Sequence, residues 1–377
     1  MEKQRKSSLL ENNAIQMLLA SFLCIIVGLL IGYIALLIIN PKGATEAILS
    51  IIENFFVRSS PAAQSKYFGQ TLVKTAPLLM CSLSILFAYK VGLFNIGAAG
   101  QYVVGAGASL YAALAWGMPW WFCLLLAMVV GALWGCISGI LKAFLNVNEV
   151  ISCIMLNWIG LYLVNMLLSA VKDPASPYTL KINNVNPSAK LPSLGLEKLF
   201  SNDKYVSLAI PLAIVISVLI WLIINRTKLG YELRATGLNK NAAKYCGMRE
   251  KTNTILAMCI SGALAGLGAA MLYLTGFEEW SCTQSSIPGM GFNGIAAAFL
   301  GGLSPVGSIF SSYFIQHITA GGTYVDKTMY CSQISDFISS VIIYLCGFVL
   351  FFRTVMKKHV RKPIESAADK KNVKEAD

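Results

Sequence analysis

Seven residues in apolar stretches of the sequence could contact a polar solute that crosses a membrane. They are amide side chains and neighbouring aromatic residues: Asn95, Gln101, Asn157 and Asn293, with Phe94, Trp158 and Phe292. Amides hydrogen-bond hydroxyl groups and heterocycle edges, and aromatic rings stack on planar rings. Polar residues inside membrane spans are costly and usually face the bundle interior. We therefore predict that the set lines a pathway. The alternative is that each amide bonds a neighbouring helix, a contribution of about 1 kcal/mol or less.

No motif in the sequence predicts catalysis or a metal site. A Gly-x-x-x-x-Gly-Lys-Ser/Thr phosphate loop is absent, as are Gly-x-Ser-x-Gly and His-Glu-x-x-His. The ten cysteines lack pair spacing, and the chain has only two histidines. His317 and Asp336 have no recognisable partner in the pattern. We expect no enzyme activity, no ATP hydrolysis, no cofactor and no metal in this chain.

The segments that carry the amides are strongly apolar. The 377 residues are 56% hydrophobic and 13% charged, and the mean hydropathy is +0.64, whereas soluble domains have roughly 25% charged residues. Six stretches lack Asp, Glu, Lys and Arg altogether: 12–41, 91–141, 150–171, 205–225, 252–277 and 280–325. Each is long enough for the about 20 residues of a spanning helix. The net charge of +12 fits basic residues beside membrane spans better than binding of nucleic acid.

These stretches predict an all-α polytopic membrane protein with about ten spans. The two longest divide at Trp116-Gly-Met-Pro119 and at Gly301-Gly-Leu-Ser-Pro305, both typical of turns. The predicted spans are 14–39, 71–90, 95–115, 119–142, 150–170, 205–225, 252–276, 286–302, 305–322 and 336–353.

Lysine and arginine predict the orientation of the spans. Segment 226–251 has seven basic and two acidic residues, and the tail from Arg353 has eight and four. Both segments and the basic N-terminus should be cytoplasmic, and the span counts between them are even. The predicted parts are a cytoplasmic N-terminus (1–13), a transmembrane domain (14–353) with an interfacial helix near 44–57 and an outer loop at 171–204, the cytoplasmic segment 226–251, and a cytoplasmic basic tail (354–377).

The cytoplasmic segment 226–251 differs from a plain polar connector. It mixes apolar and basic residues and contains glycines, and the residues of interest are Leu233, Arg234, Gly237, Asn239, Ala242, Ala243, Tyr245 and Gly247. Asn239 can cap a short helix over 239–245. Such a helix presents a small apolar face that the groove of a peripheral protein would accept. The alternative is a solvated loop held by lipid phosphates.

Two glycine patterns predict how the helices pack. Gly92-Leu-Phe-Asn-Ile-Gly-Ala-Ala-Gly-Gln101 and Gly289-Met-Gly-Phe-Asn-Gly-Ile-Ala298 are similar, and one lies in each half of the chain. Matching glycine-interrupted segments indicate broken helices along a pathway and a possible two-half internal repeat. Gly131, Gly135 and Gly139 form a small-xxx-small stripe for close helix packing.

Four motifs resemble those of a known transporter group. They are Leu233-Arg-Ala-Thr-Gly-Leu-Asn-Lys-Asn-Ala-Ala-Lys-Tyr-Cys-Gly-Met248, the segment Gly92–Gln101, Asn148-Glu-Val-Ile-Ser-Cys-Ile-Met-Leu-Asn157, and Gly291-Phe-Asn-Gly-Ile-Ala-Ala-Ala-Phe-Leu-Gly301. The first resembles the coupling-helix segment of ABC importer permeases of the branched-chain amino acid, ribose and nucleoside group. The other three resemble its nucleoside-type branch. The continuation Gly302-Leu-Ser-Pro305 departs from the pattern of the nucleoside members.

The resemblance implies a division of labour between subunits. Two permease chains, the second a paralogue, would form a pathway in the cell membrane. A cytoplasmic ABC ATPase would dock on the coupling segment and use the ATP, and an extracytoplasmic lipoprotein would deliver the cargo. Nucleosides are the expected cargo, with a sugar or branched-chain amino acid as the alternative. A stand-alone secondary carrier is less favoured, because such carriers usually place a carboxylate within their spans.

Overall fold

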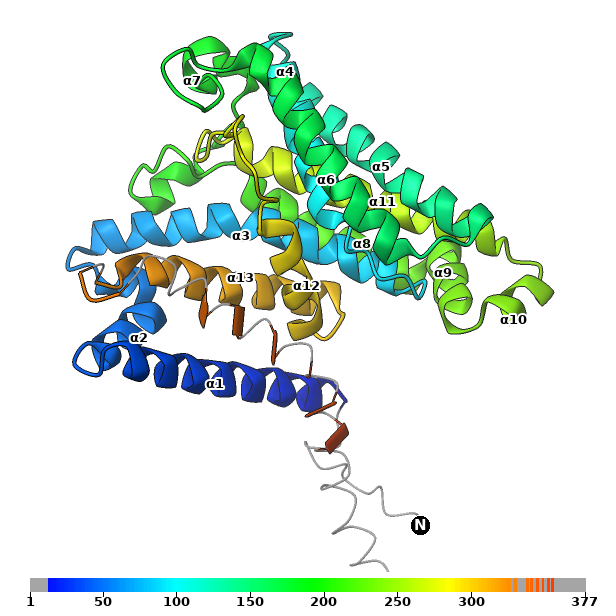
Figure 1. Ribbon diagram of the computed structural model, residues 1–377, viewed down its shortest axis with the longest axis horizontal. Coiled ribbons are helices and arrows are strands. Elements are labelled where there is room, and N and C mark those ends of the chain that lie inside the picture. The colour runs from blue at the N-terminus through cyan, green and yellow to red at the C-terminus, as the bar shows by residue number, and fades with distance from the viewer. Residues whose placement is uncertain are drawn as a thin grey trace, which may run out of the picture.

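The computed structural model describes residues 13–326 and 328–330, and single residues or pairs between 337 and 355. This part of the chain is helical and contains two isolated bridges but no strand. Its helices are α1 (Asn13–Ile39), α2 (Ala44–Glu53), α3 (Pro61–Tyr89), α4 (Ala98–Leu114), α5 (Trp120–Leu145), α6 (Glu149–Leu168), α7 (Ile182–Val185), α8 (Ala209–Arg226), α9 (Lys228–Leu238), α10 (Lys240–Tyr245), α11 (Glu250–Tyr273), α12 (Met290–Leu300) and α13 (Pro305–Gly321), as Figure 1 shows.

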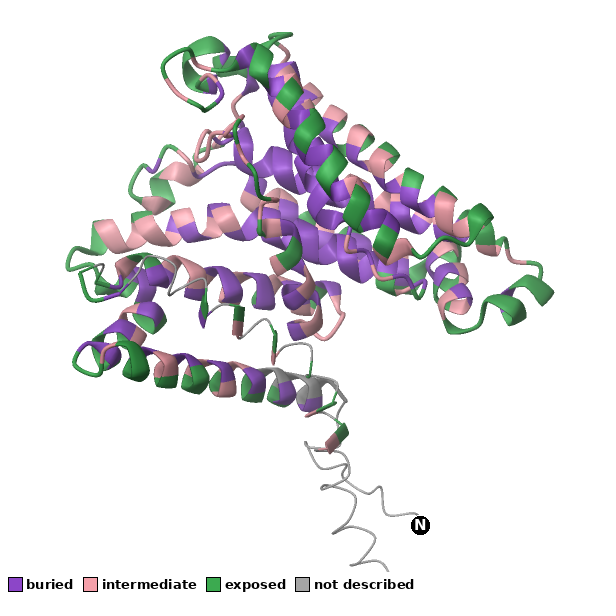
Figure 2. Ribbon diagram, viewed as in Figure 1, coloured by how far each residue is buried: buried purple, intermediate pink, exposed green. Residues whose placement is uncertain are grey.

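Two long helices form the centre of the bundle. Helices α3 and α11 pack against each other, and α11 also runs along α5. The most apolar windows of α3 and α11 are 89% and 67% buried, whereas that of α5 is 33% buried. Figure 2 shows this buried centre and the more exposed helices around it. A helix that is buried on most of its surface is apolar all round, which explains why these segments show little amphipathic pattern.

The glycine stripe of α5 lies against α11, as predicted. A Cβ atom added at Gly131 would collide with the carbonyl oxygen of Gly262, and one added at Gly135 with that of Met258. At Gly262 of α11, an added Cβ would in turn strike the Gly131 carbonyl oxygen. The two backbones are therefore in direct contact, the packing that small residues allow between membrane helices.

Helices occur at nine of the predicted spans, and the tenth, 336–353, lies largely outside the described residues. By length and composition, six described helices could cross a membrane, namely α1, α3, α5, α6, α8 and α11. Helices α4 and α13 have 17 residues each, and α12 has 11. The described residues thus establish an all-α polytopic arrangement in which three apolar helices are shorter than expected.

The predicted starts of α3, α8 and α12 are wrong by several residues, and α8 begins at Ala209 rather than at residue 205. Helix α3 begins at Pro61 rather than at residue 71, because Gln64, Lys66 and Gln70 make its first turns polar and hide them from a hydropathy argument. Helix α12 begins at Met290 rather than at residue 286, because the chain before it is irregular. The short helix predicted near residues 44–57 is confirmed as α2 followed by the 3₁₀ turn η2 (Asn54–Val57).

Exposed apolar side chains cover the outer helices. On α6 they recur every three or four residues, as Ile151, Ile154, Met155, Trp158, Ile159, Tyr162, Leu163 and Met166. Helices α1, α5 and α8 carry similar exposed apolar residues. Contiguous apolar surfaces of this extent mark contact with lipid or with another membrane subunit.

The segment 171–204 has little regular structure, as its prolines predicted, but it is fixed to the bundle. The Asn186 side chain donates hydrogen bonds to the carbonyl oxygens of Ala113 and Met118, at 2.9 and 3.0 Å. The Leu191 N–H donates to the carbonyl oxygen of Leu274, at 3.1 Å. The segment therefore covers one end of the bundle, which is the end opposite α9 and α10 (Figure 1).

Candidate functional site

A turn between α3 and α4, residues 90–97, holds the first of the predicted amides. Asn95 is fully buried and donates hydrogen bonds to Gln101 Oε1 at 2.8 Å and to Ser261 Oγ at 2.6 Å. The Ser261 hydroxyl of α11 donates to the carbonyl oxygen of Ser84 in α3, at 2.7 Å. Gly92 gives the turn its shape through a φ of 75°, a conformation that favours glycine. Asn95 thus joins α3, α4 and α11.

Asn157 of α6 reaches the same turn. Its Oδ1 accepts a hydrogen bond from the Gly100 N–H at 2.8 Å, and its Nδ2 donates to the carbonyl oxygen of Ile96 at 3.2 Å. Asn157 is 1% exposed, and a Cβ atom at Gly100 would overlap it. The amides of Asn95, Gln101 and Asn157 are therefore occupied by internal hydrogen bonds, which is the structural alternative considered for them.

Trp158 lies away from the other predicted pathway residues. Its side chain is 41% exposed on the apolar face of α6, whereas the preceding Asn157 points into the bundle. The Trp158 ring stacks on Tyr162 of the same helix, with centroids 6.2 Å apart. The structure separates two residues that are adjacent in the sequence, because helical neighbours point about 100° apart.

The remaining three predicted residues are accessible. Phe292 is 36% exposed in the first turn of α12, and Asn293 beside it is partly exposed. Among the described residues, none hydrogen-bonds the Asn293 side chain. Phe94 lies 6.3 Å from Phe299, measured between ring centroids. Phe299 follows Phe292 by seven residues and so lies on the same face of α12. The sequence did not predict Phe299 as a pathway residue.

Segment 226–251 contains the short helix that the sequence predicted. Asn239 caps α10 by accepting a hydrogen bond from the Ala242 N–H at 3.0 Å. Leu233 and Ala243 are buried, at 1% and 3% exposed, and anchor α9 and α10. Leu238 and Tyr245, in contrast, are 89% and 93% exposed. The two helices thus project apolar side chains into solvent at one end of the bundle.

Helix α9 rests directly on the turn that contains Asn95. A Cβ atom at Gly237 would collide with the carbonyl oxygen of Lys90, and the Gly237 carbonyl in turn approaches Gly92. The Asn253 side chain of α11 donates a hydrogen bond to Thr236 Oγ1 at 3.0 Å. Glycine at 237 is therefore needed for the close approach of α9, which connects the segment mechanically to the buried amide network.

Positive charge accumulates where α9 meets this turn. Burial, and then the neighbouring Arg234 guanidinium, lower the pKa of Lys90 below its usual value. No described carboxylate forms an ion pair with either side chain. A carboxylate supplied by another protein would relieve this repulsion. Elsewhere in the described chain, no group of three or more His, Cys, Asp or Glu residues could hold a metal ion.

Comparison with known proteins identifies the family. The sequence model of the family described as "Branched-chain amino acid transport system / permease component" matches residues 67–347. The chain belongs to this family. It is 34% identical to the guanosine ABC transporter permease protein NupP of Bacillus subtilis (strain 168), over 85% of this chain and 94% of the relative.

Two further relatives extend this picture. The nucleoside ABC transporter permease protein NupB of Lactococcus lactis subsp. cremoris (strain MG1363) is 30% identical over 96% of this chain and all of the relative. The guanosine ABC transporter permease protein NupQ, from the same Bacillus subtilis strain as NupP, is 29% identical over 65% of this chain and 77% of the relative. No solved structure matches the chain.

Proposed function

We propose that this protein is the membrane-spanning permease subunit of an ABC importer that moves nucleosides across the cytoplasmic membrane. The observation that carries the proposal is the exposed apolar tip of α9 and α10, which rests on the buried turn through Gly237. An isolated channel or carrier has no use for such a tip. The names of NupP and NupB support nucleosides as the cargo.

The proposed topology places α9, α10 and both termini in the cytoplasm and segment 171–204 outside. The basic character of 226–251 supports this orientation. About ten spans complete this topology. The helices α4, α12 and α13 are short, and each would cross the membrane together with the irregular turn next to it. Of the two similar motifs, Phe94-Asn95 lies just before α4 and Phe292-Asn293 lies in the first turn of α12, so both are near the start of a short helix, which supports a two-half repeat.

The proposed mechanism is alternating access driven from the cytoplasmic side. ATP binding closes a separate ATPase, which displaces α9 and α10. Because Gly237 contacts the backbone of Lys90, the displacement moves the turn at 90–97 and the N-terminus of α4. Phe94 then shifts against Phe299 of α12. Rigid elements that exchange between two packings produce this kind of switch.

The predicted pathway residues take two roles in this proposal. Phe94, Phe292 and Asn293 contact cargo, because they are the accessible members of the set and Asn293 has hydrogen-bonding capacity left. Asn95, Gln101 and Asn157 hold the turn in position. Trp158 faces lipid or the second permease. The buried amides thus act on the pathway by positioning the turn at 90–97, not by contacting cargo.

The proposed partners are a cytoplasmic ABC ATPase, a second permease and an extracytoplasmic substrate-binding lipoprotein. Lys90 and Arg234 have no carboxylate partner among the described residues, and their positive charge favours an acidic contact on the ATPase. Two guanosine permease proteins of one Bacillus subtilis strain resemble this chain, which supports a paralogous second permease. We propose that this chain uses no cofactor and that the ATPase consumes the ATP.

Uptake of labelled solutes tests the cargo. Cells with the intact importer should accumulate guanosine or uridine, and cells lacking this chain should not. Labelled ribose, glucose and leucine are the controls, because the alternative cargo is a sugar or a branched-chain amino acid. The proposal would be overturned if the importer accumulated ribose, glucose or leucine instead of a nucleoside. Uptake driven by an ion gradient without ATP would also overturn it.

A further inference from the structure

A cavity of about 410 Å³ lies between the first turns of α3, the last turns of α13 and the chain around η2. It is at the end of the bundle opposite α10 (Figure 1). It therefore lies apart from Asn95 and Asn157, on the side from which cargo arrives in the proposed topology. Its volume falls in the range of small-molecule sites, roughly 300–1,000 Å³.

Two deeply buried amides line this cavity and have unused hydrogen-bonding capacity. Asn54 is 1% exposed, and its Oδ1 has no hydrogen-bond partner in the described chain. Gln316 of α13 is 5% exposed, and no described residue hydrogen-bonds its side chain. An unpaired buried polar group costs about 1–3 kcal/mol. A bound molecule with hydrogen-bond donors and acceptors would remove this penalty.

The Asn54 amide lies beside His317 of α13. His317 Nε2 lies 2.8 Å from the carbonyl oxygen of Ile52, so this nitrogen carries the proton and donates. His317 Nδ1 lies 3.1 Å from Asn54 Nδ2 and 3.4 Å from the Tyr313 hydroxyl oxygen. Asn54 Oδ1 has no hydrogen-bond partner in the described chain and is enclosed beneath the cavity surface.

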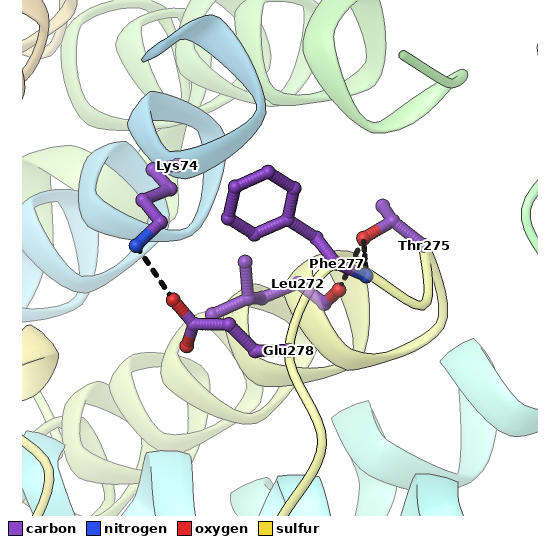
Figure 3. Close-up of polar contacts among 5 residues, drawn as sticks. All are labelled: Lys74, Leu272, Thr275, Phe277 and Glu278. Carbon is purple, nitrogen blue, oxygen red and sulfur yellow. Dashed lines mark hydrogen bonds and ion pairs between the residues drawn. The ribbon is translucent and has the colours of Figure 1, made fainter. Parts of the chain in front are cut away.

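Aromatic rings and paired charges surround the two amides. The Arg58 guanidinium lies 4.5 Å from the Tyr67 ring centroid and 4.9 Å from that of Tyr324. Lys74 Nζ forms an ion pair with Glu278 at 2.7 Å and lies 5.1 Å from the Phe277 ring. Figure 3 shows Lys74 reaching Glu278 beside this ring. Both cations thus have partners, and the unused groups at the bottom of the cavity are neutral.

The Thr275 hydroxyl fixes the part of the chain that closes the cavity. It donates to the carbonyl oxygen of Leu272 at 2.6 Å and accepts from the Phe277 N–H at 3.1 Å. This turn ends α11 and places Phe277 and Glu278 towards α3 (Figure 3). The aromatic wall is therefore held in position before any ligand binds, which reduces the entropy lost on binding.

We infer that this cavity is an outer receiving site that binds a neutral nucleoside before it reaches the pathway. Tyr67, Tyr324 and Phe277 line the site and can contact a base, and Gln316 can bond its ribose hydroxyls or polar edges. The inference rests on the proposed function and adds to it a site and a ligand charge. Glu278 neutralises Lys74, and the Arg58 guanidinium lies against two aromatic rings, so we assign the site to an uncharged nucleoside and compare it with phosphorylated ligands in the test.

Photolabelling of the assembled importer in lipid nanodiscs tests the site directly. We expect 8-azidoadenosine to label Tyr67, Tyr324 or Phe277, as mapped by mass spectrometry of peptides. Unlabelled adenosine should compete at least tenfold better than adenosine monophosphate or inorganic phosphate. Equal or better competition by the phosphorylated compounds would make this an anion site and overturn the inference, as would labelling confined to residues outside the cavity.

A matched pair of variants on α13 tests the role of the amide. Gln316→Met keeps the side-chain volume and removes the hydrogen bonds, so we expect a roughly three- to tenfold rise in the uptake KM with Vmax within twofold. Ser312→Ala removes a buried hydroxyl that also lacks a partner in the described chain but does not line the cavity. Its KM should equal that of the wild type.

The outcomes separate this site from the proposed function. An unchanged KM in Gln316→Met, with normal nucleoside uptake by the wild type, would overturn the site and leave the function standing. Absence of nucleoside uptake by the wild-type importer would overturn both. If Gln316→Met fails to assemble, Tyr67→Leu removes a ring from the cavity wall instead, and an unchanged KM in that variant counts against the site equally.

Discussion

At the scale of single residues, Asn95 and Asn293 occupy matching places in two similar motifs but have different surroundings. Each follows a phenylalanine near the start of a short helix, Asn95 before α4 and Asn293 within the first turn of α12. Asn95 is completely buried and bonded to Gln101 and Ser261. Asn293 is partly exposed, and within the described chain its side chain bonds to nothing. The first can stabilise the fold, and the second can bind a solute.

The same substitution at the two positions should therefore affect different properties: stability at Asn95 and uptake kinetics at Asn293. Asn95→Leu removes the hydrogen bond to Ser261 and leaves the buried Gln101 side chain without its partner, so we expect the free energy of unfolding to fall by about 1–3 kcal/mol. Asn293→Leu should change stability by no more than about 0.5 kcal/mol and raise the uptake KM severalfold. Thermal unfolding in detergent and uptake kinetics give the two readouts. A loss of stability in Asn293→Leu without a change in KM would assign it a structural role.

At the scale of elements, we propose that α9 and α10 act as a lever that contacts the turn at 90–97 through the backbone of Gly237. Since Lys90 and Gly92 lie directly beneath this glycine, a side chain there must push α9 away from the turn. The exposed tip of the lever, at Leu238 and Tyr245, is unaffected by such a change. Docking and transmission of motion are therefore separable by substitution.

Gly237→Ala tests the transmission of motion. We expect it to retain the ATPase on copurification but to reduce nucleoside uptake at least tenfold, because the added Cβ collides with the Lys90 carbonyl oxygen. Lys240→Ala, an exposed change on α10, is the control and should support normal uptake. Wild-type uptake by Gly237→Ala would show that the contact does not transmit motion.

Substitutions at the tip test docking. Leu238→Asp and Tyr245→Asp place charge on the two most exposed apolar residues of the segment, so the recovery of ATPase with the permease should fall at least tenfold. They are better probes than Ala243→Asp, because Ala243 is 3% exposed and its change would disturb α10 itself. Tyr178→Ala, at the other end of the bundle, should leave recovery unchanged. Undiminished recovery with both tip variants would exclude this docking surface.

At the scale of the whole molecule, the positions of most helices could be predicted because uncharged runs report burial in lipid or in the bundle. The start of α3 could not, because its polar first turns bond other parts of the chain, as Gln70 does with Asp203 at 2.8 Å. The stripe at Gly131 and the cap at Asn239 were predictable, since close approach and capping depend on local spacing.

The candidate site was predictable only as a set of residues. Whether an amide is saturated depends on partners distant in sequence, such as Ser261 for Asn95, and no local pattern reports them. Phe299 and Gln316 escaped prediction for the same reason, because their roles follow from the packing of α12 and α13 against α3. For Ser261, the sequence offered one signal, namely a polar hydroxyl within an otherwise apolar stretch.

The orientation of the bundle can be tested with a cysteine that the chain already has. Cys246 follows α10 and is exposed, so in the proposed topology it faces the cytoplasm. A membrane-impermeant maleimide should leave it unlabelled in intact cells and label it in inverted vesicles. Leu199→Cys, at a position that is 71% exposed in segment 171–204, should show the reverse pattern.

Cys246→Ser provides the background for this assignment, because loss of the vesicle signal in that variant identifies the labelled residue. The two accessible positions lie at opposite ends of the bundle (Figure 1), so they must react from opposite sides if α8 crosses the membrane between them. Labelling of both from the same side would contradict that crossing. Labelling of Cys246 in intact cells would invert the orientation and place the lever where no ATPase could reach it.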